Sequence, residues 1–142
     1  MIQYVLGFAF SEDGSQVLLI NKNRPDWQAG KLNGIGGKVE NNEAIIDAMV
    51  REFREETTLN TTPGCWQLFL KMNSLHDNTE VYCYRMSDDF IQHAESVTDE
   101  PVGVYLTDEA HQLHTLPSVR ILLPMALDNN LEYSEINYRS KS

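Results

Sequence analysis

A glycine-rich segment leads directly into an amphipathic helix, and this junction restricts the possible folds more than any other part of the chain. From Asn42 to about Thr57, apolar residues recur at the i, i+3, i+4, i+7 and i+8 spacing of one helical face. They are Ile45, Ile46, Met49, Val50 and Phe53. A helix of this kind buries its apolar face against another layer, so the sequence predicts a layered domain.

The segment before the helix, from Lys22 to Gly37, contains Pro25 and glycines at positions 30, 34, 36 and 37. We expect a loop without regular structure here. A loop of about 16 residues is unusual inside a compact domain, and loops of that length commonly carry function.

Apolar runs elsewhere in the chain predict strands at residues 5–10, 16–21, 66–72, 80–86 and 102–106. The first two should form a hairpin. A short helix near 110–113 and a last helix at 118–127 complete the pattern; Pro117 suits the first turn of the last helix and Pro124 should kink or shorten it. These elements predict a mixed α/β domain over residues 1–131. Residues 132–142 have few apolar side chains and are expected to form a loose tail.

Size and composition are those of one globular domain. The 142 residues are 42% hydrophobic and 23% charged, and a chain of this length can bury a core without disulfides. The first residues lack the basic region of an export signal, and the apolar runs fall far short of the ~20 residues that span a bilayer. We therefore expect a soluble, cytoplasmic protein without a membrane partner.

The net charge of −10 restricts the possible ligands. A protein this acidic is repelled by the phosphate backbone, so we expect no stable nucleic-acid partner. A small polyphosphate meets the same repulsion unless a metal ion intervenes.

Three carboxylates supply a possible metal site. Glu52, Glu55 and Glu56 lie on one face of the predicted helix, where like charges repel. A solvated acidic face is the common explanation for such a cluster. Here, however, the cluster lies at the C-terminal end of the helix, where the helix dipole disfavours negative charge, and it follows glycines that let a ligand approach the backbone. Grouped carboxylate oxygens suit Mg²⁺ or Mn²⁺.

At this point the chain resembles the Nudix hydrolases, whose signature is G-x5-E-x7-R-E-U-x-E-E-x-G-U, with U a bulky aliphatic residue. The matching residues are Gly37, Glu43, Arg51, Glu52, Phe53, Glu55, Glu56 and Leu59. Phe53 is aromatic where an aliphatic is usual, and Thr58 replaces the last glycine. Because a β-branched residue disfavours positive φ, we expect Thr58 to adopt a negative φ and the helix to end differently.

The resemblance implies a Nudix-type α/β/α sandwich with a mixed sheet, the motif helix and a C-terminal helix. It also implies a Mg²⁺-dependent enzyme, with Mn²⁺ as the other candidate, that hydrolyses a nucleoside diphosphate linked to another moiety. Glu52, Glu55 and Glu56 would hold the metal, with the carbonyl of Gly37 as a further ligand. Arg51 and Glu43 would orient these glutamates, and either Glu52 or Glu55 would be the general base.

The segment from Trp27 to Glu40 resembles that of the MutT-type enzymes, which cleave 8-oxo-dGTP to the monophosphate. This resemblance implies that Asn33 contacts the purine edge and that Lys38 meets a phosphate. Trp27 could stack on a base or anchor the loop. Asp99 and Glu100 could contact the base or be solvated loop acids. A monomer and a homodimer are both compatible with the sequence.

Two other functions stay open. The same chemistry could act on a nucleotide sugar or a dinucleoside polyphosphate. A non-catalytic nucleotide-binding Nudix module is the alternative from another class, although all three glutamates are present.

Overall fold

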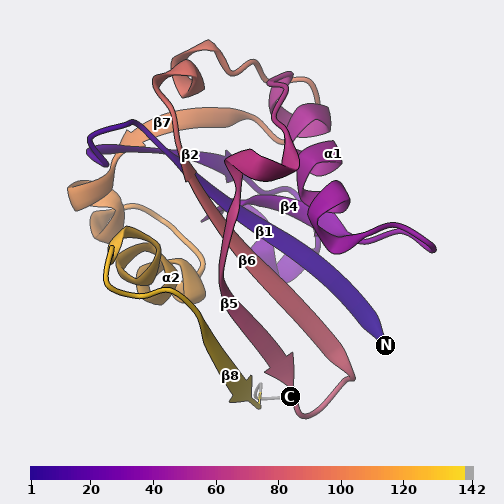
Figure 1. Cartoon of the computed structure of the whole chain (residues 1–142). Helices are drawn as coiled ribbons and strands as arrows, with labels where there is room; N and C mark the ends of the chain where they lie inside the picture. Colours follow the sequence, from indigo (N-terminus) through magenta and orange to yellow (C-terminus); the bar gives the residue numbers. More distant parts are fainter. Residues whose placement is uncertain (140–142) are drawn as a thin grey trace.

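The computed structural model describes residues 1–139 of the chain. One mixed sheet crosses the molecule, and a helix packs on each of its two faces (Figure 1). Within the described residues the sheet has eight strands in the order β3-β2-β1-β6-β5-β8, with β4 added to β1 and β7 added to β2. The strands are β1 (Ile2–Phe10), β2 (Gln16–Asn21), β3 (Leu32–Asn33), β4 (Ile35–Lys38), β5 (Gln67–Ser74), β6 (Thr79–Ser87), β7 (Val102–Leu106) and β8 (Ser134–Tyr138).

Strand β1 is the centre of this arrangement because it has a different partner on each edge. It runs parallel to β6 along its whole length, while its other edge pairs first with β4 and then with β2, both antiparallel. The sheet therefore divides beside β1, and the helix that follows β4 lies over the division.

The two main helices are α1 (Ile45–Thr57) and α2 (Pro117–Leu127). Short 3-10 helices occur at η1 (Asp26–Gln28), η2 (Pro63–Cys65), η3 (Asp89–His93) and η4 (Thr107–Gln112). None of the helices formed by residues 1–139 is long and apolar enough to cross a membrane.

Alternate residues of β1 build the two cores. Val5 points toward α1 and packs with Met49 and Phe53, whereas Phe8 points to the opposite face and packs with Leu122 of α2. All five side chains are at most 2% exposed. This arrangement is the α/β/α sandwich that the family resemblance implies, and that prediction is confirmed.

The predicted strands at 16–21 and 102–106 have the bounds of β2 and β7, but the loop prediction for Lys22–Gly37 is wrong in part. The segment contains η1, β3 and all of β4 except its last residue, Lys38. Its glycines permit close pairing, since a Cβ at Gly36 would lie 1.9 Å from the carbonyl oxygen of Val5 in β1. A strand that approaches its neighbour this closely needs glycines, and the same glycines make it look like a loop in the sequence.

The prediction of a loose tail is wrong for Ser134–Tyr138. These residues form β8, which runs parallel to β5 at the edge of the sheet (Figure 1). Ile136 packs against the core under α2, so one apolar side chain at the correct register attaches the strand. The rest of that prediction, for residues 140–142, lies outside the described residues.

Candidate active site

The first element of the site is the contact between β4 and α1. Gly37 lies in β4 opposite Val5, and the carboxylate of Glu52 from α1 lies directly over it. A Cβ at Gly37 would be 2.4 Å from both Cδ and Oε1 of Glu52, a separation that real atoms do not adopt. A glycine is therefore required at this position for the carboxylate of Glu52 to lie against the strand, which gives the motif glycine a physical role.

Arg51 joins the acidic residues of the motif. Its Nε donates to Glu43 Oε2 at 2.7 Å, and its Nη2 donates to Glu43 Oε1 at 2.9 Å. Its Nη1 donates to Glu52 at 3.0 Å and to Glu55 at 3.2 Å. A further bond runs from Nη2 to the carbonyl oxygen of Lys38. These ion pairs link the N-terminal approach of the helix to its last turns.

Of the motif glutamates in the described part of the chain, Glu56 is the one without an ion pair to Arg51. Its Oε2 is buried and has no hydrogen-bond partner among residues 1–139. Burial and the nearby charge of Glu52 raise the pKa of Glu56 to about 7. Burial also raises the pKa of Glu52, although Arg51 partly opposes this shift. A buried carboxylate without a partner is costly when it is charged, and either a proton or a bound cation removes that cost.

The residues present fit a divalent cation. Glu52, Glu55 and Glu56 offer only carboxylate oxygens, the hard ligands that Mg²⁺ and Mn²⁺ prefer. Within residues 1–139, no three acidic, histidine or cysteine side chains already surround a common point that could hold a metal ion. In this arrangement the Nη1 of Arg51 donates to one oxygen of Glu52 and one of Glu55. The three glutamates lie on one side of α1, at the i, i+3 and i+4 spacing of its last turns.

The residues expected to contact the substrate come from separate segments: η1, β3, the end of β4 and the loop before β7. Asn33 is half-buried, and its Oδ1 accepts a hydrogen bond from the N–H of Gly34, which leaves its Nδ2 group as the donor. Trp27 is 65% exposed in η1. Lys38 is exposed at the end of β4, and Asp99 is exposed and paired with Arg24 at 2.6 Å.

Comparison with known proteins bears directly on this arrangement. The sequence model of the NUDIX domain matches residues 3–130, most of the chain. The chain belongs to the Nudix family. It is therefore a pyrophosphohydrolase of nucleoside diphosphates linked to another moiety, from a family that generally uses divalent metal cations.

Several solved Nudix structures resemble this Nudix enzyme. A MutT structure from work on Aliivibrio salmonicida and Vibrio cholerae has a TM-score of 0.73 and 23% identity over 89% of this chain and 96% of that chain. MutT from Bacillus halodurans has a TM-score of 0.69 and 18% identity over 98% and 91%. The NUDIX domain of Shewanella oneidensis NrtR, solved with ADP ribose, has a TM-score of 0.71 and 17% identity over 89% and 86%. At such low identity these likenesses show the fold alone.

The Nudix helix ends differently from our expectation, because Thr58 adopts the left-handed conformation with φ 68° and ψ −4°. The prediction of negative φ is wrong. The N–H of Thr58 donates to the carbonyl of Arg54, and the buried Thr57 donates its hydroxyl to Phe53 and accepts the N–H of Leu59. Thr57 and Leu59 are both buried, so the chain turns between them. Thr58 adopts the left-handed conformation of this turn although it is not a glycine.

Sequence reasoning missed Lys22 beside the Nudix site, and it considered Glu100 only as a base contact or a solvated loop acid. Glu100 is buried and forms an ion pair with Lys22 at 2.9 Å. Both charges act on Glu56: Lys22 lowers the pKa of that carboxyl and Glu100 raises it. The sequence offers weak signals, a basic Lys22-Asn23-Arg24 stretch and an acidic pair before β7, and nothing in them shows that the two segments meet.

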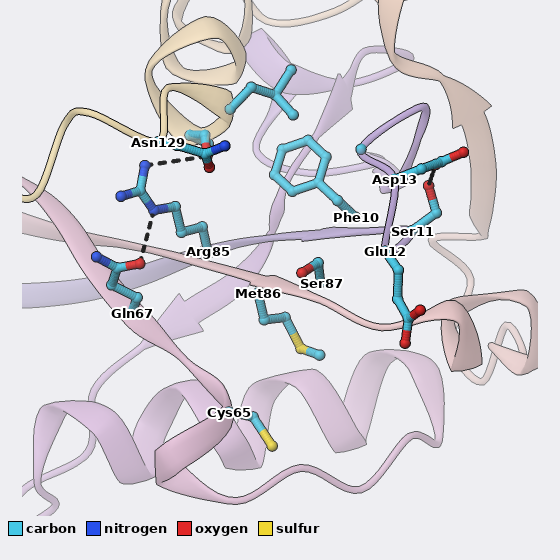
Figure 2. A pocket seen from close by; sticks show the side chains of 13 residues that line it. Phe10, Ser11, Glu12, Asp13, Cys65, Gln67, Arg85, Met86, Ser87 and Asn129 are labelled. Carbon is cyan, nitrogen blue, oxygen red and sulfur yellow. Dashed lines mark hydrogen bonds between the residues drawn. The ribbon is translucent and has the colours of Figure 1, made fainter.

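A cavity of about 440 Å³ lies away from the Nudix carboxylates, at the C-terminal ends of β1 and β6 (Figure 2). Phe10, Met86 and Gln67 line it together with Arg85. Figure 2 shows Arg85 directed toward the end of α2, and its guanidinium donates to the backbone there. The cavity contains none of the motif residues, so it is not the catalytic site.

Proposed function

We propose that this Nudix enzyme hydrolyses a nucleoside triphosphate to the monophosphate and pyrophosphate, with an oxidised purine nucleotide such as 8-oxo-dGTP as the leading candidate. The observation that carries the proposal is the buried, unpartnered Oε2 of Glu56, next to carboxylates that Arg51 gathers on one surface. An acidic surface of this kind can approach a polyphosphate only through a cation.

Glu52, Glu55 and Glu56 would hold the divalent ion, Mg²⁺ or Mn²⁺, with the carbonyl of Gly37 as a further ligand. A bound divalent ion would neutralise phosphate charge and lower the pKa of an attacking water. Glu52 or Glu55 would take the proton from that water as it attacks phosphorus, and both lie within reach of the same Arg51 Nη1. Pyrophosphate would leave as the water oxygen bonds to phosphorus.

Arg51 and Glu43 would act as positioning residues. The guanidinium holds Glu43 through two bonds and is therefore fixed before it contacts Glu52. Bidentate pairing of this kind is more rigid than a single ion pair. The carboxylates would then need little reorganisation when the substrate binds.

Base recognition would fall to Asn33, with Trp27, Lys38 and Asp99 as further substrate contacts. Since Oδ1 of Asn33 accepts from Gly34, the free Nδ2 group would donate to an acceptor on the base edge. Trp27 would stack on the base through its exposed ring. Lys38 would meet a phosphate, and Asp99 would accept from the base only after releasing Arg24.

A second candidate is a nucleoside diphosphate linked to a sugar. The observation that favours it is the ADP ribose bound to the NUDIX domain of NrtR, whose fold superposes on this chain with a TM-score of 0.71. The carboxylate chemistry is the same for both candidates, and only the group that leaves differs.

The test is a substrate panel of canonical and oxidised nucleoside triphosphates, ADP-ribose and dinucleoside tetraphosphates, each assayed with Mg²⁺ and with chelator. We expect pyrophosphate from triphosphates, and no turnover with chelator. Glu52→Gln and Glu56→Gln should each lower kcat at least ~100-fold while the protein stays folded. Glu80→Gln, which breaks an ion pair of β5 and β6, is the matched control. Turnover that survives the chelator, or near wild-type rates in both variants, would refute the metal site.

A further inference from the structure

The sheet ends at β8 in an edge that is open within the described part of the chain (Figure 1). On its inner side β8 runs parallel to β5, with Ser134 beside Leu70 and Tyr138 beside Ser74. Among residues 1–139, no strand and no backbone hydrogen bond is recorded on its outer side. The exposed edge of a sheet is a template for pairing with a strand of another chain.

The register of β8 shows which of its backbone groups face outward. The carbonyl oxygen of Tyr138 accepts the N–H of Leu75, so Tyr138 directs its backbone groups toward β5. Successive residues of a strand direct their N–H and C=O groups to opposite sides, so Ile136 also faces β5. Glu135 and Asn137 therefore direct their N–H and C=O groups to the open side.

This edge is self-complementary about a two-fold axis through Asn137. If a second β8 runs antiparallel along the open side with that axis, Asn137 lies opposite its own copy and Glu135 lies opposite Arg139 of the second copy. Arg139 follows β8 directly and would extend the pairing by one residue. Opposing residues whose N–H and C=O groups face each other exchange both backbone hydrogen bonds. All the outward groups of β8 would then have partners.

The side chains that meet in this register attract one another. Glu135 is 52% exposed and would face the exposed Arg139 on both sides of the axis. On the opposite face of the sheet Ile136 would lie opposite Tyr138 of the second copy. Opposite-charge pairs and pairs of an aromatic with a β-branched residue are both favourable between neighbouring strands.

The same residues select one register among the neighbouring ones. An axis through Glu135 would place two carboxylates directly opposite each other, which is unfavourable. An axis through Ile136 would place Glu135 opposite Asn137, without a pair of opposite charges. Of these three axes, the one through Asn137 is the one that pairs Glu135 with Arg139.

We propose that the outer edge of β8 is a self-association surface, where a second copy of this chain adds its own β8 antiparallel and extends the sheet across a two-fold axis at Asn137. The net charge of −10 on each copy opposes association, and a strand of five residues gives a small interface. The dimer is therefore weak and forms at micromolar concentrations. The proposal goes beyond the hydrolase activity and does not depend on the substrate.

The test is sedimentation velocity of the full chain between about 1 µM and about 500 µM, a range that covers weak association. We expect the dimer fraction of the wild type to rise with concentration. Asn137→Pro removes an outward N–H and none of the bonds to β5, and proline is tolerated at such edge positions. This variant should stay monomeric over the whole range, with little change in its thermal midpoint.

Charge reversal tests the register. Glu135→Arg makes the chain less acidic and Arg139→Glu makes it more acidic, yet each places like charges opposite each other on both sides of the axis. Each should therefore weaken the dimer about tenfold. The double variant restores both pairs at the original net charge and should restore the dimer. Glu109→Arg and Arg120→Glu make the same charge changes at exposed positions of η4 and α2, and they measure the effect of net charge alone.

The outcomes that would overturn the proposal are distinct. A wild-type chain that stays monomeric at every concentration would refute self-association, and a dimer that survives Asn137→Pro would refute the role of β8. A dimer that Glu135→Arg strengthens as much as Glu109→Arg does would follow net charge and refute the register. Failure of the double variant to recover the dimer would do the same. The substrate panel tests the hydrolase function separately, so the two proposals can fail independently.

Discussion

Two arginines of this protein donate similar numbers of hydrogen bonds, yet the groups that accept these bonds differ. Arg51 donates mainly to carboxylates, those of Glu43, Glu52 and Glu55. Arg85 donates to backbone carbonyls at the end of α2, and its guanidinium lies 5.6 Å from the ring centre of Phe69. The carbonyls are those of Met125, Ala126, Asp128 and Leu131.

From this difference we expect Arg51 to serve function and Arg85 to stabilise the fold. The last carbonyl groups of a helix have no hydrogen-bond partner within the helix. Arg85 therefore donates to carbonyl oxygens that would otherwise lack a donor. The carboxylates around Arg51 could be solvated or replaced without harm to the fold, but they are gathered where they repel one another. Removal of Arg85 should therefore cost stability, and removal of Arg51 should cost activity.

The largest effect is expected at Arg51. Arg51→Met leaves Glu52 and Glu55 without their common donor, so the carboxylates should separate and kcat should fall about 100-fold. Steady-state kinetics and circular dichroism would show this loss in a folded protein. Arg51→Lys keeps the charge without the planar fork and should recover only part of the rate. Full activity in Arg51→Met would show that Arg51 is not needed for catalysis and would refute the proposed difference between the two arginines.

The converse is expected at Arg85. Arg85→Met should lower the free energy of unfolding by about 2 kcal/mol, because the carbonyls at the end of α2 lose charged donors. Urea denaturation measures this change, with Gln67→Ala as a control that removes only the acceptor of Arg85 Nε. The rate per folded molecule should not change. A loss of turnover at unchanged stability would mean that α2 belongs to the site.

The raised pKa of Glu56 allows its effect on stability to be measured as a function of pH. In the folded metal-free protein its pKa is raised to about 7 from the ordinary 4.5 of a glutamate, mainly by burial. The folded state therefore binds the proton more tightly, and its contribution to stability is present below pH 4.5 and lost as pH rises to about 7. Glu56→Gln should remove this loss, so that the metal-free variant exceeds the wild type by about 1 kcal/mol at pH 8.

Denaturation of both proteins between pH 4 and pH 8, in chelator, measures that difference. The stability gap should grow with rising pH and close when Mg²⁺ is added to the wild type. A constant gap across this range would show that Glu56 does not titrate there.

The smallest effect is expected at Thr58. Its left-handed conformation costs a β-branched residue about 1 kcal/mol, and Thr58→Gly should recover part of this in stability. Turnover should change less than about tenfold, since the glutamates lie before this position. Thermal denaturation and kinetics measure the two quantities, with Thr58→Ala as a control that keeps a Cβ. A larger gain in turnover would mean that the natural helix end distorts the site.

Local patterns were sufficient wherever one segment decides its own structure. The period of Met49 and Phe53 indicates the buried face of α1, and the run at 16–21 has the bounds of β2. Local patterns failed where a partner distant in the sequence determines the structure of a segment. Gly36 is strand because β1 approaches it, and Ile136 is strand because β5 offers an edge.

The site shows the same division. The spacing of Glu52, Glu55 and Glu56 on one helix follows from helical geometry, so their grouping and the family could be read from the order of residues. Neither the burial of Glu56 nor the contact of Glu100 with Lys22 could be read in this way, because segments about 80 residues apart must first meet in the sheet. Helical period and residue type act over a few positions, and they determined which chemistry this chain carries. Desolvation and long-range charge depend on what surrounds each group, and only the folded chain decided which of its acids is held, which is exposed and which lacks a partner.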